Sequence, residues 1–131
     1  MNKEEKELLL RDLCNRLPYN VMCQVEFKED GKYNSKVMLL SGIFTDEAYF
    51  TTKGGSIYSN EYKPYLRPMS SMTEEEQRTL DSMCNGVEMA SRLSGLKMFD
   101  KAFNWLNENH FDYRGLIEKG LAIDATGKKI Y

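Results

Sequence analysis

The stretch that decides the fold is VMCQVEFK, residues 21–28. Every second residue in it is apolar, namely Val21, Cys23, Val25 and Phe27. A period of two residues is typical of a β-strand with one buried face and one solvated face. We therefore predict a strand here, with the Cys23 side chain pointing into the core.

More strands are predicted downstream of this one. Asp30 and Gly31 indicate a turn, and residues 36–44 then form a second strand with a bulge or bend at Gly42. Residues 48–52 and 56–58 are two short strands, joined by a turn at 53–55 whose glycines adopt positive φ angles easily. These segments predict an antiparallel meander. The prolines at 64 and 68 favour a 3₁₀ turn followed by an edge segment, because proline lacks the N–H that a central strand needs.

An amphipathic helix is predicted before the strands, over residues 2–17. Asn2 and Glu5 form a capping pair at its start, and Pro18 ends it. Its apolar side chains recur at steps of three and four residues, which places one stripe against the core. That stripe consists of Leu10, Leu13, Cys14 and Leu17.

Helices also dominate the second half of the chain. Thr73 is the predicted N-cap of one helix, with Glu76 completing a capping box. The stripe of this helix contains Leu80, Met83, Cys84 and Val87. Residues 91–95 are predicted to be a loop. The next helix covers 97–109, and its apolar face is so wide that we expect it to be largely buried.

The last segment resembles a short helical turn that Asp112 caps and Gly120 ends, followed by a final strand at Leu121 and Ile123. Together these elements predict an α+β fold in one domain, residues 1–131. Residues 1–70 hold a helix on a curled antiparallel meander or a small SH3-like barrel, and residues 71–131 are mainly helical.

Composition excludes several kinds of function. The formal net charge of -2 argues against a protein that coats duplex nucleic acid. The start of the chain predicts neither a signal peptide nor a membrane span, so we expect a cytoplasmic protein. Cys14, Cys23 and Cys84 lack zinc-finger spacing and lie on predicted core positions, so we expect three inert thiols, no metal and no cofactor.

A binding surface is predicted between residues 49 and 67, where tyrosines alternate with cations. Tyrosine and arginine are frequent in protein interfaces, and aromatic rings with cations also bind single-stranded nucleic acid. An ordinary sheet whose rim carries half-buried tyrosines is the third interpretation. The candidate residues are Tyr49, Lys53, Tyr58, Tyr62, Lys63, Tyr65 and Arg67.

The single histidine, His110, is the remaining candidate for catalysis. Glu108 and Asp112 lie two positions before and after it, and a neighbouring carboxylate is the group that orients a histidine acting as a general base. It also stands at the end of a predicted helix, where a donor side chain satisfies exposed carbonyls. We prefer this capping role and predict no catalytic residue.

Three stretches resemble a known family: RDLCNRLPY (11–19), KPYLRPMSSMTEEE (63–76) and NWLNENHFDYRGLIEKGLA (104–122). The resemblance is to a family of small uncharacterised proteins of Bacteroides-type gut bacteria and their phages. It implies a phage or mobile-element setting, in which small acidic proteins often bind another protein, including host factors. We therefore hypothesise a non-catalytic protein-binding module, with a single-stranded nucleic-acid-binding β-barrel and an enzyme using His110 as alternatives.

Overall fold

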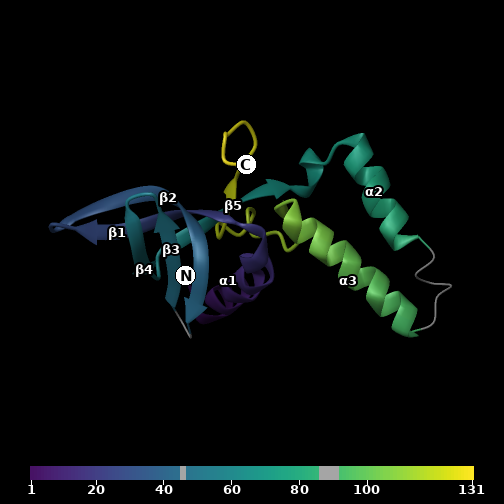
Figure 1. Cartoon of the computed structure of the whole chain (residues 1–131), viewed down its shortest axis with the longest axis horizontal. Helices are drawn as coiled ribbons and strands as arrows, with labels where there is room; N and C mark the ends of the chain where they lie inside the picture. Colours follow the sequence, from purple (N-terminus) through teal and green to yellow (C-terminus); the bar gives the residue numbers. More distant parts are fainter. Residues whose placement is uncertain (45–46, 86–91) are drawn as a thin grey trace.

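The computed structural model describes residues 1–44, 47–85 and 92–131. It has an N-terminal helix, a mixed sheet and a helical C-terminal part, so the predicted α+β class is confirmed (Figure 1). The elements are α1 (Lys3–Arg16), η1 (Leu17–Tyr19), β1 (Met22–Glu29), β2 (Lys32–Phe44), β3 (Glu47–Thr52), β4 (Gly55–Ser59), β5 (Tyr62–Pro68), η2 (Met69–Ser71), α2 (Glu74–Cys84), α3 (Arg92–Glu108), β6 (Phe111–Asp112) and β7 (Ile123–Asp124).

The strands form one sheet in the order β4-β3-β2-β1-β5-β6, with β7 also paired to β5. The first five strands pair antiparallel, whereas β6 and β7 run parallel to β5. The sheet curls without closing into a barrel, so the predicted meander is the form that the chain adopts and the SH3-like barrel is wrong.

The β1–β2 hairpin extends beyond the rest of the sheet as an arm (Figure 1, left). Asp30 and Gly31 connect its strands with φ angles of 50° and 77°. Two residues with positive φ make a type I′ turn, which matches the twist of a hairpin, so the predicted turn is confirmed. The register of β2 on β3 shifts between Leu40 and Gly42, which confirms the predicted bulge.

The prediction of a 3₁₀ turn between Pro64 and Pro68 was wrong. These residues belong to β5, and the 3₁₀ turn comes only afterwards, at Met69–Ser71. The strand pairs with β1 through residues 62–64 and with β7 and β6 from Tyr65 onward. Because the partners change next to Pro64, the missing N–H of the proline does not interrupt a long ladder.

The core lies between α1 and the inner face of the curled sheet. Leu9 and Leu13 of α1 are 1% and 0% exposed, and Cys23 is fully buried as predicted. Burying a leucine of this kind contributes about 1.5–3 kcal/mol. The rest of the cluster is Val21, Val25, Met38, Leu40, Ala48, Phe50, Tyr62, Leu66, Leu116, Leu121 and Ala122.

Two cysteines that were assigned to helical core stripes are exposed. In α1 the buried residues are Leu9, Asp12, Leu13 and Arg16, which turns Cys14 toward solvent. Cys84 is exposed because α2 has no buried residue at all. Both predictions failed because the spacing of an apolar stripe does not show which side of the helix the rest of the chain covers. Val87 lies outside the described residues.

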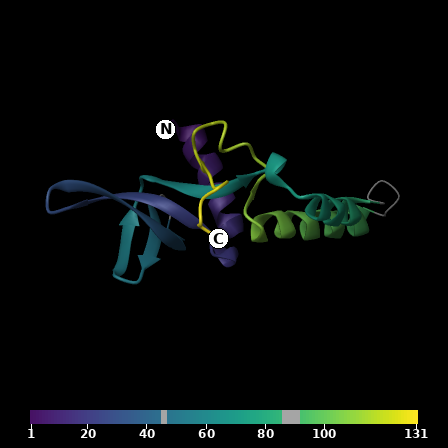
Figure 2. The ribbon, with the colours of Figure 1, turned by 90° about the horizontal axis from the view of Figure 1, so that it is seen from above.

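Helices α2 and α3 pack side by side and project from the body, opposite the arm (Figure 2). The predicted capping box is confirmed, since Thr73 Oγ1 accepts from the N–H of Glu76 at 3.1 Å.

Two predictions about α3 were wrong. Residues 92–95 begin the helix instead of forming a loop, and residue 91 lies outside the described residues. The wide apolar face of α3 is only half covered.

The C-terminal segment returns to the body after α3. The carboxylate of Asp112 accepts from the N–H groups of Leu116 and Ile117 at 2.8 and 2.9 Å, and Gly120 has a φ of 73°. The predicted capped turn and its glycine end are confirmed. Ile123 then pairs with Tyr65, so a last strand does form, but it covers Ile123–Asp124 and leaves Leu121 outside.

Candidate interaction site

The seven predicted binding residues do not form one surface. They divide into an exposed aromatic group, two buried tyrosines, two separate lysines and an arginine held in an ion pair. The pleat turns Tyr49 and Tyr58 to the outer face of the sheet, whereas β5 is buried on both faces at Tyr65 and Leu66.

Tyr49 and Tyr58 lie opposite each other on the outer face of β3 and β4, with ring centroids 4.9 Å apart. Phe44 of β2 joins them, its ring centroid 6.0 Å from that of Tyr58 and nearly edge-on. We call these three residues the aromatic triad. Phe44 and Tyr58 are 60% and 55% exposed. The sequence analysis missed Phe44, which reaches the triad because of the bulge before Gly42.

The backbone of the sheet holds the triad in place. Tyr49 donates from its hydroxyl to Ser56 Oγ at 2.6 Å, which fixes its ring across β4. A Cβ at Gly42 would meet the Phe44 ring and the Tyr49 Cβ at 3.8 Å, so the rings pack around this glycine. The triad is thus a solvent-facing group of rings on the outer face of the sheet.

Tyr62 and Tyr65 are buried instead of presented to solvent. Tyr62 packs on Phe50 at 5.2 Å between ring centroids, and burial raises the pKa of its hydroxyl to about 12. Tyr65 is 7% exposed, and its carbonyl accepts from the hydroxyl of Tyr131 at 2.8 Å. Both residues stabilise the fold, and neither offers a contact surface.

Arg67 is occupied by interactions within the chain. Its guanidinium donates two hydrogen bonds to the carboxylate of Glu76, at 2.7 and 2.8 Å, and lies 4.1 Å from the ring centroid of Phe111. The arginine hydrogen bonds are the main cause that holds the pKa of Glu76 at about 2. This pair ties β5 to the first turn of α2.

The two lysines lie apart from each other. Lys53 is exposed in the turn between β3 and β4, four residues after Tyr49 in the sequence. Lys63 lines a groove of about 830 Å³ between the start of α1, strand β5 and the C-terminal segment. Glu5, Glu26, Glu61 and a second lysine, Lys119, line the same groove.

His110 ends α3 with a positive φ of 63°. Its ring stacks on Tyr131 with 3.6 Å between centroids, and its Nδ1 has no hydrogen-bond partner among the described residues. Burial is the main cause that lowers the pKa of this histidine to about 4, with smaller contributions from Arg16 and Arg67. At neutral pH the ring is uncharged and accepts protons poorly, which does not suit a general base.

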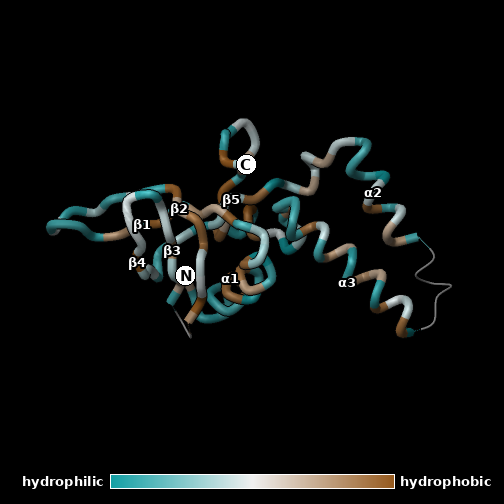
Figure 3. Tube along the Cα trace, viewed as in Figure 1, coloured by the Kyte–Doolittle hydropathy of each residue, from teal (hydrophilic) through white to brown (hydrophobic). Residues whose placement is uncertain are grey.

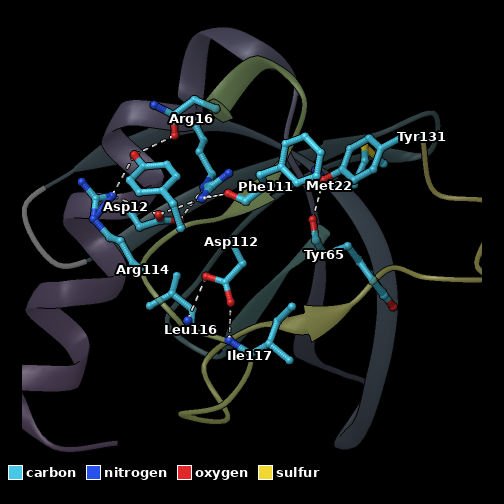
Figure 4. Close-up of polar contacts among 12 residues, drawn as sticks. Asp12, Arg16, Met22, Tyr65, Phe111, Asp112, Arg114, Leu116, Ile117 and Tyr131 are labelled. Carbon is cyan, nitrogen blue, oxygen red and sulfur yellow. Dashed lines mark hydrogen bonds and ion pairs between the residues drawn. The ribbon is translucent and has the colours of Figure 1, made fainter. Parts of the chain in front are cut away.

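A buried polar network on the inner side of α1 was not predicted from the sequence (Figure 4). Asp12 and Arg16 are both fully buried and form an ion pair at 2.7 Å. Arg16 Nη2 also donates to the carbonyl of Phe111 at 2.7 Å, and Arg114 Nη1 donates to Asp12 at 3.1 Å. The sequence did contain a signal for this network, because Asp12 and Arg16 lie on the same helical face as Leu9 and Leu13.

Other kinds of site find no support in residues 1–44, 47–85 and 92–131. Within them no three histidine, cysteine, aspartate or glutamate side chains gather as metal ligands would. No helix in these segments has the length and apolar character needed to cross a membrane. Comparison of the chain with protein families, curated proteins and solved structures finds no match.

Proposed function

We propose that this chain is a non-catalytic protein-binding module, acting in a phage or mobile-element setting by engaging a host factor through the aromatic triad. The observation that supports this best is the cluster of Phe44, Tyr49 and Tyr58 on the outer, solvent-facing side of the sheet. Aromatic side chains lose little conformational entropy on binding and bury a large area, so they are frequent anchors of protein interfaces.

The arrangement of charge favours a protein partner over single-stranded nucleic acid. A strand-binding sheet places cations beside its stacking rings to hold phosphates. Here Lys63 lines a separate groove with three glutamates and Lys119, and Arg67 is paired with Glu76. Of the three predicted cations, only Lys53 belongs to the β3–β4 hairpin that carries Tyr49 and Tyr58.

A comparison of two exposed tyrosines tests the proposal. Tyr58→Ala removes a triad ring, whereas Tyr33→Ala removes a 77% exposed ring from the arm and serves as the matched control. Both variants should unfold with the same midpoint as wild type. A host protein captured by wild type and the control should be lost with Tyr58→Ala, and the purified partner should then bind with a weakened Kd.

Two results would contradict the proposal. One is capture of the same proteins by wild type and Tyr58→Ala. The other is tight binding of oligonucleotides that falls steeply between about 50 and about 200 mM salt, which would indicate phosphate contacts instead.

A further inference from the structure

Helix α3 carries two apolar stripes; the described residues cover one of them and leave much of the other exposed, although Phe103 contacts the Tyr113 ring at 5.5 Å between centroids. The first stripe contains Gly95 and Ala102, which are buried, and Met98, which is half-buried. The second stripe, which we call the α3 seam, consists of Leu96, Phe99 and Phe103, spaced three and four residues apart. Its residues are 66%, 44% and 47% exposed. Figure 3 shows apolar residues reaching the far end of α3, away from the body.

The seam and its neighbour form one continuous apolar patch instead of scattered single residues. With adjacent Leu93, which is 64% exposed, it presents roughly 450 Å² of apolar side chain, judged from typical areas of such residues. Single exposed leucines need no explanation, but a continuous apolar patch of this size is often functional. Spacing of three and four residues is that of a coiled-coil contact stripe.

We propose that the α3 seam binds the seam of a second copy of this chain, forming an antiparallel, two-fold symmetric helix pair. This inference is independent of the proposed function. Two seams together with their Leu93 residues present roughly 900 Å² of apolar surface, and the stems of flanking residues bring the total to about the 1,000 Å² that a specific interface needs. The net charge of -2 per copy opposes the association only weakly.

The direction of the pairing follows from the ends of the seam. A parallel pair would place Arg92 against the Arg92 of the second copy and would bring both sheet bodies to the same end. An antiparallel pair sets the bodies at opposite ends, which the projection of α2 and α3 from the body permits (Figure 1). It also places Arg92 over Phe103 of the second copy, where a cation–π contact is favourable.

The spacing also fixes the register. In an antiparallel coiled coil, each contact layer pairs an a position of the heptad in one helix with a d position in the other helix. Leu96 of each copy then faces Phe99 of the other, in two equivalent layers at the centre. The layers Arg92–Phe103 close the pair at both ends. The overlap is short, so we expect a dissociation constant in the micromolar range.

Analytical ultracentrifugation of the full chain from about 1 to about 200 µM tests the pairing over the range in which a micromolar dimer would assemble. Wild type should shift from 15.2 kDa to twice that mass as the concentration rises. Leu96→Glu should stay monomeric at all concentrations with an unchanged unfolding midpoint, because Leu96 is largely exposed in one copy. Lys97→Glu changes a neighbouring exposed residue outside the seam and should still dimerise.

A charge complementation experiment tests the register. Phe99→Lys should also be monomeric alone, yet a mixture of Leu96→Glu and Phe99→Lys chains should form a heterodimer, because the introduced acid and base face each other in one layer. A monomeric wild type at 200 µM would overturn the proposal, as would a dimer that Leu96→Glu leaves intact. Failure of the mixture to pair, with both variants folded, would overturn the antiparallel register.

Discussion

The two helical regions of this protein use apolar side chains in opposite ways. Helix α1 inserts Leu9 and Leu13 into the concave face of the sheet and leaves them 1% and 0% exposed. Helix α2 contacts mainly α3 and has no buried residue, whereas α3 contacts α1 and β6 at its C-terminal end and leaves its other end largely uncovered. The difference shows that an amphipathic stripe identifies a surface to be covered, but does not identify what covers it.

The largest expected effect is in the buried network of α1. Asp12→Ala leaves Arg16 buried without its carboxylate partner, and breaking such a pair typically costs about 3–5 kcal/mol in the free energy of unfolding. Chemical denaturation monitored by circular dichroism measures the change. Glu7→Ala, an exposed acid on the same helix, is the control and should change stability by less than about 0.5 kcal/mol. Equal effects in the two variants would show that the network contributes nothing to stability.

A matched pair of leucine truncations tests the comparison directly. Leu13→Ala should destabilise by about 2–5 kcal/mol, because it empties a filled core site. Leu96→Ala should change the unfolding free energy by less than about 0.5 kcal/mol in dilute solution, because its side chain is 66% exposed. Thermal or urea unfolding of both variants gives the two values. A large loss of stability from Leu96→Ala would mean that the chain itself covers the α3 seam.

The histidine at the end of α3 should make stability depend on pH. Its pKa is about 4 in the folded chain and 6.5 in the reference state, so the unfolded chain binds the proton first as the pH falls. Its stabilising effect is therefore complete above about pH 6.5 and is lost toward pH 4, with a slope of at most about 1.4 kcal/mol per pH unit.

Urea unfolding of wild type and His110→Asn between pH 7 and pH 4.5 isolates this contribution. Asparagine tolerates the positive φ at this position, so the variant should keep the helix end. The wild type should lose more stability than His110→Asn as the pH falls. Parallel pH profiles would show that the ring is not held neutral by burial.

The smallest expected effect lies at the start of α2. Thr73→Ala removes the side-chain oxygen that caps the N–H of Glu76 and should cost about 1 kcal/mol. Hydrogen exchange of α2 amides should report the loss, while the amides of α1 stay unchanged. Equal loss of protection in α1 would indicate that the two helical regions unfold together, and would weaken the contrast between them.

Local chemistry explains which elements were predictable. The alternation around Cys23, the turn at Asp30 and Gly31, the cap at Thr73 and the turn at Asp112 all depend on nearby residues, and all appear in the structure. The predictions for Cys14, Pro64 and residues 92–95 failed, because each depends on a neighbour that is distant in the sequence. For the binding site, sequence placed Tyr49 and Tyr58 correctly in strands but had no means of separating them from Tyr62 and Tyr65.

The sequence by itself determined those elements that depend on local pattern: a strand with a two-residue period, helices with a period near 3.6, and caps and turns formed by short-range hydrogen bonds. Only the tertiary structure decided which stripe each helix buries and which tyrosines reach solvent. The physical reason is that burial depends on the position of the covering element. The sheet lies over Leu13, whereas no described residue of the chain covers Leu96 to the same extent.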